Sequence, residues 1–449
     1  MWRISRSALT MVGKRRTAFV ATVAICEQLF LALALLWCVA LINATRVAAQ
    51  IAPVAGSVSL PAPTQAPKAA IVPATTTSST GVIVSTTSIQ PKSAETAKAD
   101  SKPAESAKTI ALVLPLSSKT LGKAAEAVRA GFIAAAEVSG KEKFAHRIYL
   151  AEDEGTSLAI LYRKAVAEGA VAIVAGVTRD GATVVAREAG YLPTLAVNTP
   201  IDLAMADANN FFHMSLSLDW DAKLVARAAT QEGFRNVAIL FSNASSSGML
   251  SRRIQDSFEK EWMRLGGTIA ARVGFSGDLT DGGKVKSAME KAEAAKAEAV
   301  FIAADMQSAR FARTYLPQGL PVFATAQTIE PGAGAVENLD LESVKYLEMP
   351  WFAERDHAAV MSYPRPPEGT PVDYERLYAL GIDAWRIIVA LLTANNDAST
   401  GSNVDRLKRS FAPIDGVTGR ITLDGNQFFR GLTLLEMRDG RPQLVKSAE

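Results

Sequence analysis

The pattern of hydrophobic and polar positions changes abruptly near residue 109. The segment TIALVLPLSS (109–118) is a continuous apolar run of strand length, closed by Pro115 and a pair of serines. The next segment, 123–140, carries apolar residues at helical spacing and stops at Gly140. Continuous apolar strands followed by such helices are typical of a parallel sheet covered on both faces. The chain is therefore predicted to form an α/β fold from residue 109 onward.

The strand–helix alternation continues in two series. The first runs from 146 to 198, and the second begins with a helix at 221–234 and ends with a strand at 320–326. Two doubly wound, Rossmann-like lobes in series predict a bilobal protein with a cleft between the lobes. The expected lobe boundaries are about 109–216 and 353–425 for lobe 1, and about 217–352 and 426–449 for lobe 2.

A late segment, YERLYALGIDAWRIIVALL (374–392), is apolar around more than one side. It predicts a core helix in which Gly381 permits close approach to a neighbouring element. Asp383 is spaced to pair with Arg386 at i, i+3. No base, metal ligand or nucleophile accompanies Asp383, so we expect a structural and not a catalytic carboxylate.

Residues 1–49 have the features of a targeting segment. Basic residues precede a long apolar stretch, and Val47-Ala48-Ala49 fits the small-x-small rule for cleavage. We expect a signal peptide that exports the protein to the periplasm, with an uncleaved inner-membrane anchor as the alternative. Trp37 and Ile25 stand before the two cysteines, where a lipoprotein signal needs a small residue, so the sequence argues against lipidation.

Residues 50–108 are rich in Pro, Ala, Ser and Thr, contain no aromatic residue and keep no helical or strand period. Such a segment buries too little apolar surface to offset its ordering entropy. It is predicted to be a disordered tether between the targeting segment and the folded lobes.

Composition narrows the chemistry. The formal net charge of +3 is small for 449 residues, and Lys and Arg are mixed with Asp and Glu, so no nucleic-acid partner is expected. The only cysteines are Cys26 and Cys38, which excludes disulfides and thiolate metal sites from the exported part. The three histidines lack metal-ligand spacing, and the one SxxK match, Ser257 to Lys260, lacks its partner motifs. We expect no enzyme, metal or cofactor.

Several segments resemble, in order, the C-terminal domain of the LpoA/LppC penicillin-binding protein activators. The likeness covers nearly all of 109–445 and is carried by these segments: IALVLPLSS, AVRAGFIAA, VAGVTRDGATVVAREAGYLPTLAVN, RRIQDSFEKEWMRLGG, YLEMPWF, RLYALGIDAWRI and GVTGRITLDGNQFFRGLTLLEMRDGRPQ. The resemblance implies a type I periplasmic binding protein fold, similar to the leucine-binding proteins. Best-known members are outer-membrane lipoproteins with an N-terminal helical-repeat domain, and this sequence has a tether and no lipid-bearing cysteine in their place.

The resemblance also implies a function and a partner. Members of the family activate a class A penicillin-binding protein and raise its peptide cross-linking activity in peptidoglycan synthesis. We expect an exported, non-enzymatic regulator that works by docking on that synthase. The alternative is a solute-binding protein of a branched-chain amino-acid ABC transporter, and a third option is the sensor lobe of a receptor complex.

In leucine-type binding proteins the loop after the third strand holds a ligand carboxylate through hydroxyls and a helix N-terminus. The matching loop here is GVTRDGA (176–182). Polar residues that follow other strands are predicted to face the same crevice. Their alternative role is helix capping and turn formation. The candidates for an amino-acid-like or muropeptide ligand are Ser117, Ser118, Thr178, Arg179, Asn198, Thr199, Ser242 and Asn243.

Candidates for partner contact come from the region after the second series. Trp351 and Phe352 lie in EMPWFAERD, where hinge or core packing is the alternative to an interface. Arg365 lies in the Pro-rich loop SYPRPPEGTP (362–371), a partner contact or a rigid connector.

Overall fold

The computed structural model describes residues 107–140, 143–202, 210–276, 281–394 and 411–445. The predicted targeting segment lies outside these residues, as does the predicted tether apart from its last two positions. All structural statements below concern the described ranges.

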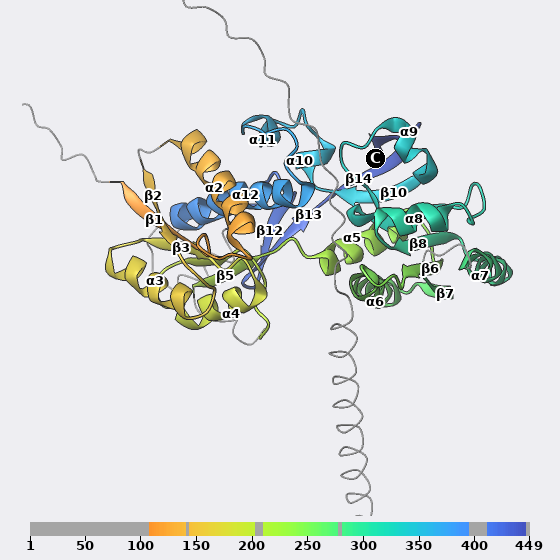
Figure 1. Ribbon diagram of the computed structural model, residues 1–449, viewed down its shortest axis with the longest axis horizontal. Helices are drawn as coiled ribbons and strands as arrows, with labels where there is room; N and C mark the ends of the chain where they lie inside the picture. Colours follow the sequence, from red (N-terminus) through yellow and green to blue (C-terminus); the bar gives the residue numbers. More distant parts are fainter. Residues whose placement is uncertain (1–106, 141–142, 203–209, 277–280, 395–410, 446–449) are drawn as a thin grey trace, which may run out of the picture. The chain divides into compact units, whose positions relative to one another are not determined.

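Two separate sheets form the two predicted lobes (Figure 1). The first is an eight-stranded sheet of order β11-β12-β13-β5-β4-β3-β1-β2, and the second is a seven-stranded sheet of order β15-β14-β10-β9-β8-β6-β7. Strands β1 to β5 and β6 to β10 pair in parallel, and the hairpin strands at the end of the chain are antiparallel. The strands are β1 (Lys108–Leu114), β2 (Phe144–Leu150), β3 (Ala172–Ala175), β4 (Thr194–Ala196), β5 (Phe211–Met214), β6 (Asn236–Ser242), β7 (Thr268–Phe275), β8 (Ala299–Ala303), β9 (Val322–Thr325), β10 (Val344–Glu348), β11 (Ile414–Asp415), β12 (Arg420–Asp424), β13 (Gln427–Gly431), β14 (Thr433–Arg438) and β15 (Arg441–Leu444).

Helices cover both faces of each sheet, as the continuous apolar strands predict. Helices α2 and α12 share one core with the first sheet, and α3 and α4 share another. In the second sheet the two layers are α5 with α6 and α7 with α8. The helices are α2 (Gly122–Ser139), α3 (Thr156–Ala167), α4 (Arg179–Glu188), α5 (Leu218–Gln231), α6 (Gly248–Arg264), α7 (Gly282–Ala294), α8 (Met306–Arg313), α9 (Ala335–Asn338), α10 (Pro350–Ala353), α11 (Ala358–Met361) and α12 (Val372–Ala394), with short 3-10 turns η3 (Ala326–Thr328) and η4 (Leu339–Leu341).

The two lobes repeat one topology. Order β2-β1-β3-β4-β5 in the first sheet corresponds to β7-β6-β8-β9-β10 in the second, the arrangement of doubly wound folds. Helix α4 after β3 therefore corresponds to α8 after β8, and α12 to α5, because each packs beside the helix that follows the lobe's first strand. The predicted fold class is confirmed.

The chain passes between the sheets three times, after β5, after β10 and after β13. The last passage lies between Gly431 and Thr433, later than the boundary expected near 425. The difference arises because β13 pairs in parallel with β5 and so belongs to the first sheet. Sequence periodicity does not distinguish this edge pairing from a return to the second lobe.

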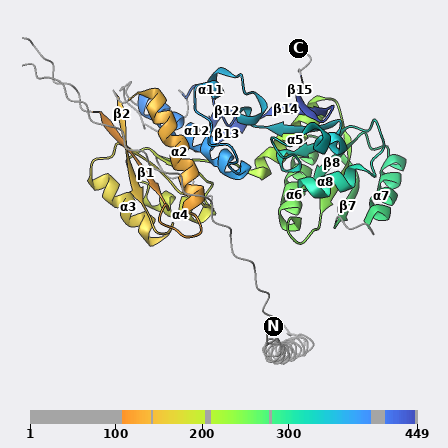
Figure 2. The same ribbon diagram turned by 45° about the horizontal axis from the view of Figure 1, so that its top comes forward.

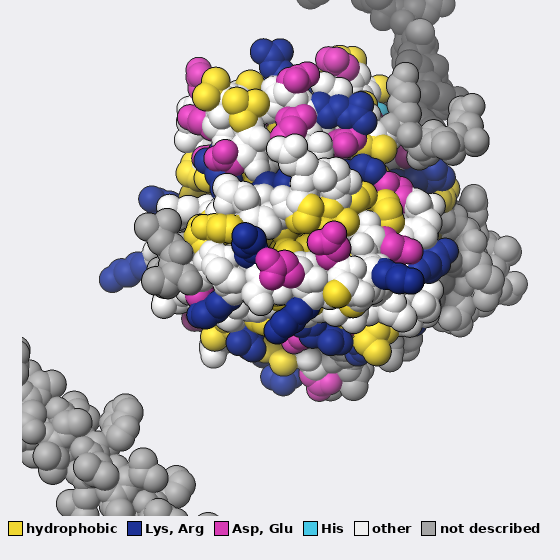
Figure 3. Space-filling view, turned by 90° about the vertical axis from the view of Figure 1, so that its right-hand side faces the viewer, with side chains coloured by type: hydrophobic (Ala, Val, Ile, Leu, Met, Phe, Trp, Pro, Cys, Tyr) yellow, Lys and Arg dark blue, Asp and Glu magenta, His cyan; other side chains and the backbone are white. Residues whose placement is uncertain are grey.

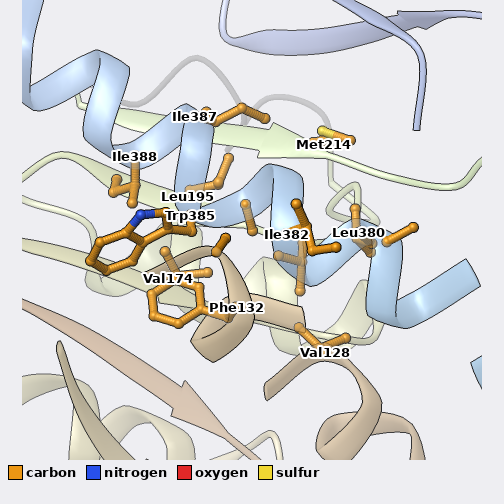
Figure 4. Close-up of a cluster of buried hydrophobic side chains, with 14 of the residues drawn as sticks. Val128, Phe132, Val174, Leu195, Met214, Leu380, Ile382, Trp385, Ile387 and Ile388 are labelled. Atoms are coloured by element: carbon orange, nitrogen blue, oxygen red, sulfur yellow. The ribbon is translucent and has the colours of Figure 1, made fainter. Parts of the chain in front are cut away.

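Helix α12 is the predicted core helix, and it packs along α2 in both ribbon views (Figures 1 and 2). A β-carbon on Gly381 would lie 2.1 Å from the carbonyl oxygen of Val128, and one on Gly131 would lie 1.9 Å from that of Tyr378. The two glycines therefore allow the backbones to touch at two points. Beside them, the rings of Trp385 and Phe132 meet edge to face at 5.1 Å (Figure 4).

Among the described residues, α12 is the one helix long and apolar enough to cross a membrane by length and composition. Its most apolar window is mostly buried inside the protein, with Leu380, Ile382, Ile387 and Ile388 in the first-lobe core (Figure 4). Its apolar character is therefore accounted for by the core of the lobe.

The predicted pair of Asp383 with Arg386 is present at 3.3 Å, and Asp383 is fully buried. Its carboxylate also accepts hydrogen bonds from the backbone N–H groups of Val417 and Thr418, at 3.1 and 2.7 Å, and from the Thr418 hydroxyl at 2.7 Å. Burial raises the pKa of Asp383, while Arg386 and Thr418 oppose that rise. Asp383 therefore anchors the turn before β12 to the core helix.

Two buried ion pairs join the lobes where the chain crosses. Arg430 at the end of β13 donates to Asp221 of α5 at 2.8 Å, and also to the backbone carbonyls of Ser215 and Thr418. Arg376 of α12 makes a two-bond contact with Glu348 at the end of β10, at 2.8 and 2.7 Å. Arg430 therefore lies beside the passages after β5 and after β13, and Arg376 lies beside the passage after β10.

The α2–α12 contact predicts the cost of adding one methyl group. Gly381→Ala should lower the free energy of unfolding by about 1–3 kcal/mol. The added methyl group would clash with backbone atoms of α2, which cannot move aside by changing rotamer as a side chain can. The matched control is Gly283→Ala in α7, where an added β-carbon meets nothing within 4 Å and the change should be neutral or slightly stabilising. Equal denaturant midpoints for the two variants would contradict the close-packing account.

The buried pair of Arg376 and Glu348 predicts a large loss of stability when one partner is removed, and a recovery when both are removed. Arg376→Met leaves the Glu348 carboxylate buried without its partner, which should cost about 3–5 kcal/mol in urea unfolding. The double variant Arg376→Met/Glu348→Met should recover most of that loss. The control Arg163→Met, which removes an exposed pair with Glu188, should cost less than about 1 kcal/mol.

Candidate functional site

The carboxyl ends of β1, β2 and β3 meet at one edge of the first sheet, where doubly wound folds place their ligand sites. A pocket of about 420 Å³ lies there, at the N-terminus of α4. It is formed by the first lobe alone. Its lining residues are Leu121, Glu154, Gly155, Thr178, Asp180, Thr183, Val184 and Arg187.

Thr178 caps helix α4, as its position in the loop after β3 predicts. Its backbone is extended, and its hydroxyl oxygen accepts a hydrogen bond from the N–H of Gly181 at 3.0 Å. The hydroxyl proton and the backbone N–H groups of Val177 and Thr178 remain available at the positive end of the helix. This donor set is the kind that holds a carboxylate.

The carboxylate that these donors hold belongs to the chain itself. Glu154, from the loop between β2 and α3, accepts hydrogen bonds from Val177 N–H at 2.6 Å and Thr178 N–H at 2.7 Å, and a further one from the Thr178 hydroxyl. The residue is 7% exposed. Burial raises the pKa of the Glu154 carboxyl, and the bonds from Thr178 and Val177 oppose that rise. Glu154 therefore occupies the position expected for a ligand carboxylate.

Gly181 makes room for this arrangement. A β-carbon at residue 181 would lie 2.4 Å from a carboxylate oxygen of Glu154. The glycine sits in the first turn of α4, where any larger residue would displace the acid from the donors. Sequence reasoning missed Glu154; the signal was an acid-rich turn after the second strand, EDEG, together with a glycine three residues beyond the cap.

The other first-lobe candidates serve turns and caps, or lie exposed. The Ser118 hydroxyl accepts from the N–H of Leu121 at 3.3 Å, before α2. Asn198 donates to the Val177 carbonyl at 2.8 Å, and the Thr199 hydroxyl is 3.1 Å from that of Ser215. Ser117 and Arg179 are exposed.

The second lobe uses a carboxylate at the equivalent turn. Asp305 after β8 caps α8 by accepting from the N–H of Ser308 at 2.9 Å, and it also accepts from the hydroxyls of Ser247 and Ser308. Ser242 is fully buried, with its hydroxyl 3.2 Å from that of Ser308. The exposed Asn243 accepts from Arg252 at 3.0 Å. The hydroxyls of Ser242, Ser247 and Ser308 are thus engaged by the lobe's own groups.

Of the three partner-contact candidates, Trp351 takes the alternative role of core packing. Trp351 is fully buried, its indole N–H donates to Glu375 at 2.9 Å, and the guanidinium of Arg365 stacks 3.9 Å above its ring. It is a packing residue of the first-lobe core, because the short helix α10 directs it inward. Phe352 is half-buried beneath Arg376, and Arg365 is exposed.

Within the described ranges no three His, Cys, Asp or Glu side chains gather as a metal site. The SxxK serine, Ser257, lies on α6 and donates to Asp219 at 3.2 Å. At the edge of the first sheet, the N–H groups of Val177 and Thr178 and the Thr178 hydroxyl all donate to Glu154.

Comparison with protein families gives one match over most of the chain. The family model described as "LppC putative lipoprotein" matches residues 91–440. Among curated proteins, "Penicillin-binding protein activator LpoA" of Enterobacter sp. (strain 638) is 22% identical over 266 residues, 48% of this chain and 36% of that protein. The protein of the same name from Escherichia coli O6:H1 is 21% identical over 260 residues, 49% of this chain and 37% of that one. The chain thus spans little more than a third of these relatives' length.

Two solved structures share the fold. The LpoA (YraM) C-domain from Haemophilus influenzae, named as a regulator of PBP1A, has a TM-score of 0.60 at 17% identity and covers 76% of this chain and 100% of that one. A "putative branched-chain amino acid ABC transporter" protein from Chromobacterium violaceum has a TM-score of 0.60 at 29% identity, over 73% of this chain and 99% of that one.

The hydrogen bonds of Glu154 at the N-terminus of α4 predict that removing this carboxylate creates an anion-binding site. Glu154→Ala leaves three hydrogen-bond donors without their acceptor, so the variant should be less stable than the unaltered protein. Acetate should bind these donors and restore part of the stability. The melting temperature should then rise with the logarithm of the acetate concentration, and more than in chloride at the same concentration. Glu152→Ala, which removes an exposed acid two residues away, should respond to acetate and chloride alike. A folded Glu154→Ala variant without an acetate-specific rise would show that the donors do not form an anion site.

Proposed function

The chain belongs to the LppC family, and we propose from that premise that it is an exported, non-enzymatic regulator of peptidoglycan synthesis. It activates a class A penicillin-binding protein by protein–protein contact. The names of the curated relatives, penicillin-binding protein activators, support this assignment, as does the name of the Haemophilus domain that shares the fold.

The observation that carries the proposal is the Glu154 carboxylate at the N-terminus of α4. A transport receptor of this fold needs that position free, since the ligand's carboxylate binds there. In this chain the position is filled by a side chain with three hydrogen bonds at 7% exposure. Replacing an intramolecular carboxylate by a free one costs association entropy and gains no new bond. The site is therefore disfavoured as an amino-acid receptor.

The second candidate is a solute-binding protein of a branched-chain amino-acid ABC transporter. It is favoured by the Chromobacterium protein, which is 29% identical over almost its whole length. That protein shares the bilobal fold, so the choice depends on the chemistry of the cap and not on the architecture.

The mechanism proposed for activation is selective docking. A partner that binds the active conformation of the synthase more tightly than the inactive one shifts the population toward activity. The buried ion pairs at the passages between the sheets suit a protein that presents a fixed surface.

Location follows from the targeting segment. We propose export to the periplasm, with residues 50–108 linking the signal or anchor to the folded lobes. The family description names a lipoprotein, whereas Trp37 and Ile25 precede the two cysteines of this chain. The proposal is therefore a periplasmic protein without a lipid anchor.

One experiment separates the two candidates. The purified chain from residue 50 onward is heated with branched-chain amino acids or with muropeptides, and is separately mixed with a class A synthase. We expect an unchanged melting temperature with the small molecules, co-purification with the synthase, and a higher rate of peptide cross-linking. A melting temperature that rises with the logarithm of an amino acid's concentration, without synthase binding, would support the transport receptor instead.

A further inference from the structure

A groove of about 1160 Å³ runs along the second lobe, and its volume exceeds those of the cap pocket and of a pocket of about 680 Å³ beside α2. One wall is helix α5, and the floor is made by β10 and β14. Half of the lining residues are aliphatic, and they lie on α5 and on the floor. The residues are Leu224, Arg227, Ala228, Gln231, Glu232, Lys345, Leu347, Gly431, Leu432, Thr433, Leu434 and Val445.

The groove exists because α5 covers only part of its sheet. Helix α5 packs on β9 and β10, whereas the helix in contact with β14 is the short α10, whose Ala353 packs with the core on the α8 side. On β14, Leu435 and Met437 pack on the α8 side and are buried. Leu434 of β14 and Leu432 just before it pack on the α5 side and are only half-buried. A strip of aliphatic sheet face is therefore left open.

The first lobe covers the corresponding face with its own helix. There, α12 is 23 residues long, whereas its counterpart α5 has 14. On the face that α12 shares, Phe212, Met214 and Phe428 of β5 and β13 are at most 2% exposed. The comparison indicates that the second lobe lacks a helical layer at this place.

Charges at the rim of the groove already have partners within the chain. Lys345 pairs with Glu232, and Arg227 contacts Glu261 at 2.7 Å while its guanidinium lies 4.8 Å from the centre of the Trp220 ring. On the second-lobe face that Figure 3 shows, Lys and Arg side chains are likewise mixed with Asp and Glu. A rim of paired charges does not select a highly charged ligand, so binding here depends on the aliphatic floor.

The floor cannot accept an added strand. Strand β14 is hydrogen-bonded on both sides, to β10 and to β15, so its backbone groups are already paired. An extended peptide laid on this floor would bury its own N–H and C=O groups without partners, which is unfavourable. A helix satisfies its backbone internally and presents only side chains, as in helix-in-groove recognition.

We propose that this groove, between α5 and β14, docks an amphipathic helix of a protein partner that presents aliphatic side chains at i, i+3 or i+4, and i+7. The proposal deepens the proposed function, because it assigns this surface of the second lobe to the contact with the class A synthase.

The test places a photo-crosslinking amino acid at Gln231, an exposed position on the groove wall, in the full chain in living cells. The control position is Ile160 on α3, an exposed aliphatic residue of the first lobe. Cross-linked peptides are identified by mass spectrometry. We expect an adduct from position 231, and not from position 160, with a helical segment of a class A synthase.

A substitution on the floor gives the second measurement. Leu434→Glu should abolish the adduct and weaken binding of the purified synthase at least about tenfold, because a carboxylate is forced into the aliphatic contact. Leu339→Glu, at a leucine that is 53% exposed in η4, is the matched control and should leave both unchanged. If Leu434→Glu fails to fold, Ala228→Glu on α5 replaces it, since that side chain is half exposed.

The outcomes distinguish the two proposals. An adduct with a helix of a different envelope protein, lost in Leu434→Glu, supports the groove and overturns the synthase as its partner. Synthase binding that Leu434→Glu and Ala228→Glu leave intact overturns the groove and retains the proposed function. An adduct with a second copy of the chain or with its own residues 1–106, or no adduct above the control, also overturns the groove.

Discussion

The backbone contact between α2 and α12, made possible by Gly131 and Gly381, holds the rest of the structure in place. The two helices touch at carbonyl oxygens that any β-carbon would displace, and this closeness keeps α12 deep in the first-lobe core. From that position Asp383 holds the turn at 417–418, and Arg376 holds Glu348 at a passage between the sheets. The carbonyl of Thr418 in that turn accepts a hydrogen bond from Arg430, the buried cation beside the passage after β13. A steric constraint in one core thus reaches the junction of both lobes through three polar side chains.

At the edge of the first sheet, one carboxylate of the chain fills a set of hydrogen-bond donors that could hold an anion. The capping threonine, the backbone N–H groups before α4 and the helix end form the usual setting for an anion, and the chain supplies that anion from Glu154. Because the acid comes from the same chain, it is present at every ligand concentration. The donors at this helix end are therefore satisfied within the chain, and function has to be argued from such local chemistry and not from the fold.

Much of the fold was predictable from local pattern. Continuous apolar strands alternating with helices predicted two parallel sheets, and the spacing in 374–392 predicted a buried helix with a close approach at Gly381 and an Asp383–Arg386 pair. The candidate site was predictable only in part. Thr178 was expected as a cap or a ligand group, and it is a cap. For Trp351 the sequence left partner contact and core packing open, and the residue is buried in the core. Pattern alone does not say toward which layer a short helix such as α10 turns.

What the sequence determined by itself is the set of elements and the chemistry available to them. Periodicity, helix capping and the absence of cysteine beyond residue 38 are local properties, and each was legible without coordinates. Only the tertiary structure decided which partner each polar group takes. Glu154 meets Thr178 across 24 positions, Arg430 meets Asp221 across 209, and β14 comes to lie beside β10 with its outer face open. These pairings depend on how separate elements stack and cross, and stacking is set by the packing of the whole core and not by any one segment.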